Sequence, residues 1–301
     1  MYNYDIQKTK GTKPTKKEVK KMKKIISLIL ALTLGVSAML ALTSCGDNGD
    51  NGAAKTKVAA QVGTTSLMYA NVLKGVDVVS YDTFALAAQD MKNGNAAYVF
   101  VDKTTAKALC NEIAGIKYID IALSSENYGI GIDKNQANLK AQIDAILESK
   151  AADIEAIKTK YMNGEEEKYV GVTSATKDVN KADTQLVVAT NAEFAPWEYK
   201  EGEKFYGIDM EIAAILAAEL NMELVIEDMA FDNVVGSVGK QGIDIAMSGI
   251  TITAERMNVI NFSTPYYTEA IVAVCKADDT SLDAVGTVVD LLTVVCGAEE
   301  E

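Results

Sequence analysis

The chain has 301 residues, of which 49% are hydrophobic and only three are prolines, so it is long and apolar enough to bury a sizeable globular core. It contains no histidine and four scattered cysteines, which excludes histidine-based triads and argues against zinc or iron centres, so we expect no metal and no cofactor. The formal net charge of −13 argues against nucleic acid and anionic lipid as partners.

The first 44 residues have the composition of an export signal. Residues 8–24 are rich in lysine, and residues 25–43 are almost all apolar. A charged start followed by an apolar stretch and a small residue characterises a secretory signal. The alternative is an uncleaved membrane anchor, because the apolar stretch is nearly long enough to span a bilayer.

The sequence LTSC, which ends at Cys45, resembles the lipobox of bacterial lipoproteins. The resemblance implies that residues 22–44 are a lipoprotein signal peptide and that Cys45 is lipidated. Residues 1–21 would be an upstream extension, and residues 45–55 a short linker that tethers the folded part at the extracellular face of the membrane. Without the signal and the extension, which hold nine lysines and two acids, the net charge is −20.

From residue 56 onward, short β-rich runs alternate with helical patterns. The runs lie at 57–61, 77–81, 96–102 and 116–123, and the helical patterns at 65–73, 83–94 and 103–115. Such a series predicts a mostly parallel sheet covered by helices. Two more helical stretches, 138–150 and 151–162, come before a polar, acidic segment that is the best candidate for an internal linker.

A second series of the same kind follows this segment. Its β-rich runs lie at 184–190, 223–229, 244–249, 259–263 and 266–278, and its helical patterns at 208–221 and 231–239. The two series predict an α/β protein with two lobes. Ligands of open α/β sheets lie at the carboxyl ends of the strands, so the loops there are where a site is expected.

Aromatic residues follow the strand 184–190. Phe194 and Trp197 flank a proline in this loop and could form a wall against a small ligand. The alternative is that both cover the end of the sheet as ordinary core.

Arg256 is the only arginine in a chain that has 28 lysines. It lies five residues after Thr251, beyond the strand 244–249. A guanidinium binds a carboxylate through two parallel hydrogen bonds, which an ammonium cannot do. A structural ion pair, or chance, is the alternative.

Two further features follow strands of the first series. Thr64 and Thr65 open a helix, where backbone N–H groups and hydroxyls form an anion site. Asp102 ends an apolar strand and could pair with an ammonium, although a helix N-cap is the plainer reading. An arginine, a helix start, an acid and aromatic residues together indicate a receptor for a small zwitterion.

The segments LVVATNAEFAPWEYKEGEKFYGIDMEIAAILAAEL and DIAMSGITITAERMNVINFSTPYY resemble the first lobe of family 3 extracellular solute-binding proteins, the glutamine and polar amino-acid binders of ABC importers. The segments KVAAQVGTTSLMYA, NGNAAYVFVD and ENYGIGIDKNQANLKAQIDAIL resemble the second lobe of that family, but they come first. The resemblance implies a two-lobed periplasmic-binding-protein-like (type II) α/β fold, circularly permuted, with a ligand cleft between the lobes.

The resemblance also assigns the parts of the chain. Lobe 2 is expected to comprise 56–124 with 271–278, and lobe 1 to comprise 129–163 and 184–265. Strands near 125–128 and 266–270 would be the hinge. Residues 164–183 would be the linker that joins the original termini. Residues 279–301 have no assignment, and from 286 onward a helix remnant and an added edge strand are equal alternatives.

By resemblance, Arg256 would hold the α-carboxylate of the ligand with help from Thr251 and the helix start at Thr64 and Thr65. The α-ammonium would meet Asp102, Ser248 and Gly249. Phe194 and Phe231 would enclose the aliphatic part, and Asn191 and Gln61 would read the side chain. An asparagine at position 191 favours a neutral polar ligand.

The expected function is therefore a lipid-anchored receptor that delivers a polar amino acid to an ABC permease, and not an enzyme. A sensory receptor, a degenerate permutant that cannot bind, and a catalytic relative of these receptors are the alternatives. The sequence leaves open which amino acid binds, whether Met1 or Met22 is the start, how Cys110, Cys275 and Cys296 pair, and whether the chain is a monomer or a swapped dimer.

Overall fold

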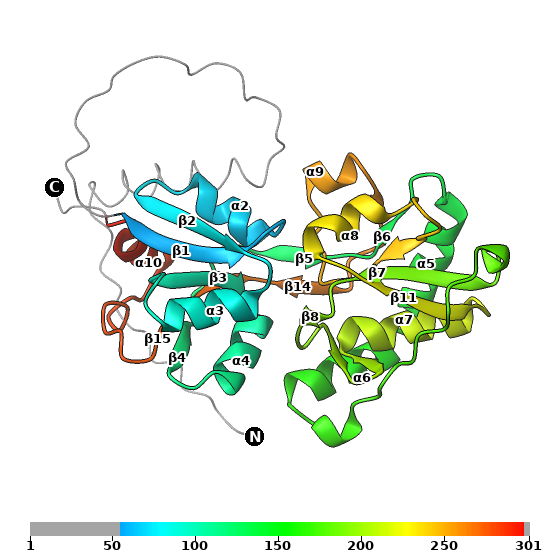
Figure 1. Cartoon of the computed structure of the whole chain (residues 1–301), viewed down its shortest axis with the longest axis horizontal. Coiled ribbons are helices and arrows are strands. Elements are labelled where there is room, and N and C mark those ends of the chain that lie inside the picture. The colour runs from blue at the N-terminus through cyan, green and yellow to red at the C-terminus, as the bar shows by residue number, and fades with distance from the viewer. Residues whose placement is uncertain (1–54, 298–301) are drawn as a thin grey trace, which may run out of the picture. The chain divides into compact units, whose positions relative to one another are not determined.

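The computed structural model describes residues 55–297, which fold into two α/β lobes joined by two strands (Figure 1). The predicted signal peptide and Cys45 lie outside the described residues. In the part of the chain that is described, no helix is both long and apolar enough to cross a membrane.

Lobe 2 is built on a five-stranded sheet with the strand order β2-β1-β3-β15-β4. β1 pairs in parallel with β2 and β3, whereas β15 runs antiparallel to β3 and β4. The strands are β1 (Thr56–Gln61), β2 (Val76–Tyr81), β3 (Tyr98–Asp102), β4 (Ile116–Ile119) and β15 (Ile271–Lys276). The helices are α2 (Thr65–Val72), α3 (Phe84–Lys92), α4 (Lys103–Glu112) and α10 (Val288–Val295).

Lobe 1 is built on a second five-stranded sheet with the order β11-β7-β12-β6-β13. Its strands are β6 (Gly131–Ile132), β7 (Gln185–Thr190), β11 (Glu223–Asp228), β12 (Ile245–Ala246) and β13 (Asn261–Phe262). Its helices are α5 (Ala137–Ser149), α6 (Ala151–Met162), α7 (Ile208–Glu219), α8 (Phe231–Ser237) and α9 (Ala254–Met257). A small antiparallel sheet of β8 (Glu193–Phe194), β9 (Glu198–Glu201) and β10 (Lys204–Tyr206) follows β7.

Two antiparallel strands, β5 (Glu126–Tyr128) and β14 (Tyr267–Glu269), connect the lobes. Both are visible between the lobes in Figure 1. They occupy the positions predicted for the hinge. Glu126 and Glu269 are direct partners in this pair, so two carboxylates lie opposite each other at the crossing.

The most apolar β-rich runs of the sequence form the central strands of the two sheets. All five residues of β3 and all six residues of β7 are buried, as expected for strands that have neighbours on both sides and helices on their faces. On α7, Ile212 and Leu216 are buried, so the helix turns its apolar stripe inward.

The internal linker is more ordered than its polar composition predicts. It contains two short 3-10 helices, Glu166–Lys168 and Val179–Lys181. Between them, the N–H of Ala175 donates to the carbonyl of Leu224 at 2.8 Å, and the N–H of Ile226 donates to Ser174 Oγ at 2.8 Å. The linker therefore covers the outer edge of β11, which would otherwise present unpaired backbone groups.

Candidate functional site

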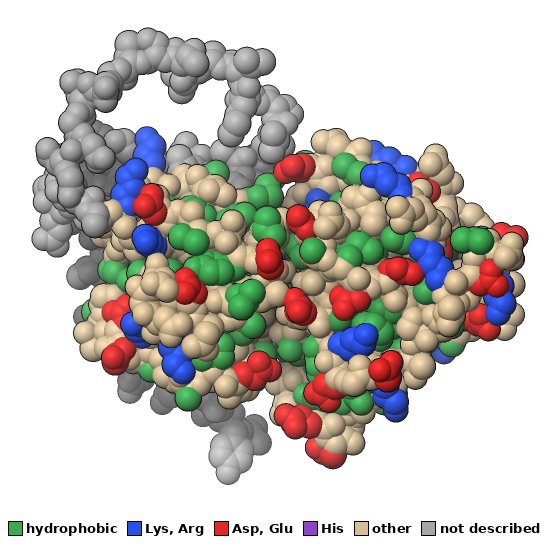
Figure 2. Space-filling model, viewed as in Figure 1, with side chains coloured by type: hydrophobic (Ala, Val, Ile, Leu, Met, Phe, Trp, Pro, Cys, Tyr) green, Lys and Arg blue, Asp and Glu red, His purple; other side chains and the backbone are tan. Residues whose placement is uncertain are grey.

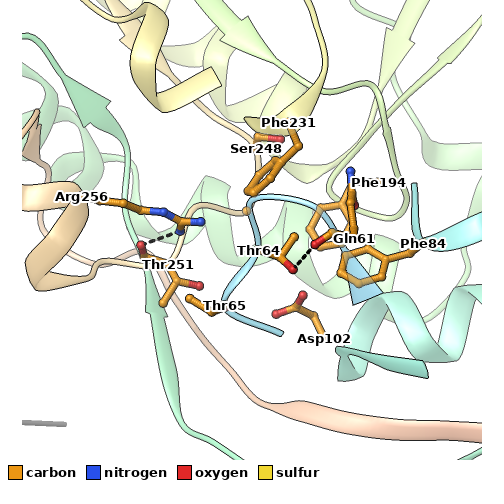
Figure 3. Close-up of a pocket in the computed structure, with 11 residues that line it drawn as sticks. Gln61, Thr64, Thr65, Phe84, Asp102, Phe194, Phe231, Ser248, Thr251 and Arg256 are labelled. Atoms are coloured by element: carbon orange, nitrogen blue, oxygen red, sulfur yellow. Dashed lines mark hydrogen bonds between the residues drawn. The ribbon is translucent and has the colours of Figure 1, made fainter. Parts of the chain in front are cut away.

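A small pocket lies between the lobes, at the carboxyl ends of β1 and β3 and beside the loops after β7 and β12 (Figure 3). The space that the centre of a water molecule can reach inside it is about 10 Å³, which is room for about one water. An amino acid can therefore enter only if the lobes move apart. The lining residues are Gln61, Thr64, Thr65, Phe84, Asp102, Phe194, Phe231, Ser248, Gly249, Thr251 and Arg256.

Arg256 projects into this pocket from α9. Its Nη1 donates to the carbonyl of Thr251 at 2.9 Å, and its Nη2 donates to the carbonyl of Gly63 in the other lobe at 3.0 Å. The guanidinium lies over the ring of Phe231, with its central carbon 5.6 Å from the ring centre. Burial lowers the pKa of Arg256, and the nearby Glu126 and Asp102 oppose this shift.

No acid among the described residues forms an ion pair with Arg256, although nine lysines do have such partners. The alternative of a structural ion pair therefore finds no support in the part of the chain that is described. Two backbone carbonyls hold the guanidinium in place and leave its remaining N–H groups free to bind a carboxylate.

Asp102 lies at the N-cap position of α4, but its side chain makes no capping hydrogen bond. Instead it is buried, and Oδ1 accepts a hydrogen bond from the hydroxyl of Tyr128 at 2.7 Å. Burial raises the pKa of Asp102 well above its usual value, and Glu126 and Glu269 raise it further. An incoming ammonium would reverse this shift, because a nearby cation favours the ionised carboxylate.

The three threonine hydroxyls of the pocket donate to protein acceptors. Thr64 donates to the carbonyl of Gln61 at 2.6 Å, as Figure 3 shows, while Thr65 and Thr251 both donate to Oε2 of Glu126 at 2.7 Å. The hydroxyl protons are therefore not available to an anion. Backbone N–H groups in the first turn of α2 are the donors that remain for it.

Sequence reasoning missed Glu126. It is a buried carboxylate on β5 that binds one threonine from each lobe. Its position in a predicted hinge strand was the available signal, but the contacts depend on how the lobes fold together.

The apolar wall of the pocket comes from Phe84, Phe194 and Phe231. The ring centres of Phe84 and Phe194 are 5.7 Å apart, and the two rings come from different lobes. Phe84 was not predicted. Gly249 has a φ of +51°, and a Cβ there would lie 2.7 Å from the ring of Phe194, so only glycine allows this close approach.

The prediction that Trp197 forms part of the pocket wall is wrong. Trp197 does not line the pocket and is fully buried, with its ring 4.9 Å from Tyr128 and 4.7 Å from Tyr267. Its indole N–H donates to Thr104 Oγ1 at 2.9 Å. The alternative that Trp197 belongs to the core is therefore the one that fits the structure. Its indole also joins lobe 1 to lobe 2 through Thr104.

Gln61 and Asn191 form a hydrogen bond across the lobes, from Gln61 Nε2 to Asn191 Oδ1 at 3.1 Å. Asn191 is buried and does not itself line the pocket. Gln61 Nε2 also donates to the carbonyl of Asp82, and Asn191 Nδ2 donates to the carbonyl of Met229. Because backbone carbonyls only accept, these contacts fix the orientation of both amides, and they use both N–H groups of Gln61, whose oxygen can still accept.

The cysteines within the described residues form no disulfide with one another. Cys110, Cys275 and Cys296 are free thiols, so the alternative of a disulfide among these three is wrong for this structure. Within residues 55–297, no cluster of acids and cysteines is arranged to hold a metal ion.

Part of the chain is similar to a known family. Residues 186–289 match the family model of bacterial extracellular solute-binding proteins, family 3. The predicted resemblance to that family is therefore confirmed for this segment. The order of the two lobes relative to the family stays a prediction.

The arginine-binding extracellular protein ArtP of Bacillus subtilis is 36% identical over 94 residues, which are 31% of this chain and 37% of ArtP. The cyclohexadienyl dehydratase of Pseudomonas aeruginosa is 38% identical over 82 residues, which are 27% of this chain and 31% of the dehydratase. The chain thus spans about a third of the length of these curated relatives, 37% of the first and 31% of the second. Among solved structures, the GluR0 ligand-binding core in complex with L-glutamate covers 81% of this chain and 93% of its own, at 12% identity and a TM-score of 0.43.

Proposed function

We propose that this protein is an extracellular receptor that binds a polar amino acid between its two lobes. The observation that carries the proposal is the guanidinium of Arg256, which lies in the pocket without an acidic partner among the described residues. An α-carboxylate would supply that partner through the remaining guanidinium N–H groups and the N–H groups that begin α2.

The rest of the pocket suits the other parts of an amino acid. Asp102 is the only acid among the lining residues and would meet the α-ammonium, together with Ser248 and Gly249. Phe194 and Phe231 would enclose the aliphatic part of the ligand.

The side-chain end favours a ligand that donates hydrogen bonds. The oxygen of Gln61 remains as an acceptor there, because both N–H groups of its amide are used within the protein, one of them on Asn191. A carboxylate side chain would find no donor in the amide of Gln61, whereas an amide side chain could donate to its oxygen. A cationic side chain would lack a second acid in the pocket, so we favour glutamine or asparagine over arginine.

We further propose that lipidated Cys45 anchors the receptor and that its closed form delivers the ligand to an ABC permease. The expected domain boundaries and the circular permutation belong to the same proposal. In support of the permutation, the predicted second-lobe segments and β15, from opposite ends of the chain, share one sheet. A domain-swapped dimer would be visible as a doubled mass in solution.

A sensory receptor and a degenerate permutant are the remaining candidates. Catalysis has less support, even though one relative is a dehydratase, because Asp102 has a tyrosine rather than a partnered base beside it.

A panel of amino acids tests the proposal through the melting temperature of the protein. We expect L-glutamine or L-asparagine to raise it most, L-arginine less, and L-glutamate and L-aspartate least, because a ligand that binds only the folded state stabilises it. No increase with any amino acid would contradict the proposed function. A larger increase with L-glutamate than with L-glutamine would contradict only the assignment of the side-chain end.

A further inference from the structure

Two buried carboxylates lie directly behind the Ser248–Gly249 corner of the pocket. Ser248 Oγ donates to Oε1 of Glu198, and the N–H of Gly249 donates to Oδ2 of Asp209 at 2.9 Å. Glu198 comes from β9 and Asp209 from α7, and both are completely buried. Neither lines the pocket, so they reach a ligand only through the corner.

These contacts determine what the corner can offer to a ligand. The hydroxyl proton of Ser248 points at Glu198, and the oxygen also accepts from the N–H of Asn191 at 3.3 Å. The N–H of Gly249 points at Asp209. Both donors of the corner are therefore directed away from the pocket, which leaves oxygen acceptors to face it. Acceptors suit an ammonium and repel a carboxylate.

We propose that Glu198 and Asp209 are positioning residues that hold the Ser248–Gly249 corner as an ammonium acceptor and thereby set the orientation of the bound amino acid. The proposal rests on the proposed function for the identity of the ligand. It adds two residues that never touch the ligand. It also explains how the α-ammonium is distinguished from the α-carboxylate at this end of the pocket.

The surroundings of Glu198 and Asp209 make the ionisation of both acids sensitive to a nearby cation. Burial raises the pKa of Asp209 to about 7 and raises that of Glu198 well above its usual value, with Asp209 and Asp228 adding to the shift of Glu198. Tyr266 donates to Asp209 at 2.8 Å, and no lysine or arginine contributes to the pKa shift of either acid. Oε2 of Glu198 is buried and has no hydrogen-bond partner among the described residues. An ammonium at the corner would favour the ionised form of both acids.

The first test needs no ligand. Ser248–Gly249 is the only serine–glycine pair in the chain, so labelling serine carbonyls with ¹³C and glycine amides with ¹⁵N isolates one NMR signal of the full chain. We expect that signal to shift with pH with a midpoint near 7, because burial raises the pKa of Asp209 to about 7, and we expect this midpoint to disappear in Asp209→Asn. A signal that does not move between about pH 5 and 9, or that keeps the same midpoint in Asp209→Asn, would overturn the positioning role.

The second test is a double-mutant cycle with L-glutamine as the probe. We expect Ser248→Ala and Glu198→Gln each to weaken binding about tenfold, and the double variant to lose no more than either single variant. A double variant that loses the product of both effects would mean that Glu198 does not act through Ser248. Failure of the wild-type protein to bind any amino acid would contradict the proposed function, whereas the NMR signal would still decide the positioning role.

Discussion

Asp102, the proposed partner of the ligand ammonium, is expected to reduce the stability of the protein at neutral pH. Its pKa is raised chiefly by burial, then by Glu126 and Glu269, so the folded state holds the proton more tightly than the unfolded chain does. The stability this proton provides is complete below the unfolded pKa of about 4 and is lost as pH rises through the folded pKa.

We therefore predict that Asp102→Asn melts at a higher temperature than the wild-type protein and that the difference grows as pH rises from about 4 to 9. The same variant should bind L-glutamine more weakly at high pH, because the charge that meets the ammonium is gone. Melting curves across pH measure the first effect. Asp120→Asn is the control, since Asp120 is an exposed partner of Lys103. A constant difference across pH would contradict the assignment.

Individual residues were predictable where the signal was local. Arg256, Asp102 and the Thr64–Thr65 helix start each follow a β-rich run, and parallel strands bring such positions to one edge of a sheet. Phe84, Glu126 and the misplaced Trp197 depend on which way a side chain points after the lobes meet. Periodicity along the chain carries no information about that direction.

At the scale of elements, α7 fixes the internal linker to lobe 1 through Glu211. This buried carboxylate accepts hydrogen bonds from Lys160, from the hydroxyl of Tyr161 at 2.8 Å and from the N–H of Val170 at 3.0 Å. One side chain thus joins the end of α6, the linker and α7.

We predict that Glu211→Ala lowers the free energy of unfolding by about 3 kcal/mol, because it leaves Lys160 buried without its partner. Glu219→Ala on the same helix is the matched control, since its ion pair with Lys150 is partly exposed and should contribute at most about 1 kcal/mol. Urea unfolding measures both. Equal losses would mean that the linker is not held by Glu211.

For the residues from 286 onward, the sequence does not decide between a helix and an edge strand. The run from 286 onward is apolar and short, so neither helix nor strand periodicity dominates. The structure forms α10, with Thr287 as N-cap accepting from the N–H of Asp290 at 3.2 Å, and it buries Leu291, Leu292 and Val295. The helical alternative therefore describes this part of the tail, and tertiary packing decides between the two.

At the scale of the whole molecule, hydrogen bonds between the two lobes hold them together around the pocket. Trp197 donates to Thr104, Gln61 donates to Asn191, and one oxygen of Glu126 accepts from Thr65 and Thr251 at the hinge. A ligand that touches both lobes would favour this closed arrangement by its differential affinity for it.

Trp197 is the only tryptophan in the chain and can report on closure. We predict that saturating L-glutamine reduces quenching of its fluorescence by acrylamide, and that Thr104→Val, which removes the hydrogen-bond acceptor, weakens binding about threefold to tenfold. Thr268→Val is the control, because the Thr268 hydroxyl contacts only Asn127 within the hinge pair. An equal effect of both variants would argue against the Trp197–Thr104 contact as part of closure.

The most direct test of the receptor is a calorimetric titration of L-glutamine into the wild-type protein and into Arg256→Lys. Roughly micromolar binding corresponds to about 8 kcal/mol, and we expect the lysine variant to lose most of it, because an ammonium cannot form the paired hydrogen bonds of a guanidinium with a carboxylate. Equal affinity in both proteins would contradict the central claim that Arg256 holds the ligand carboxylate.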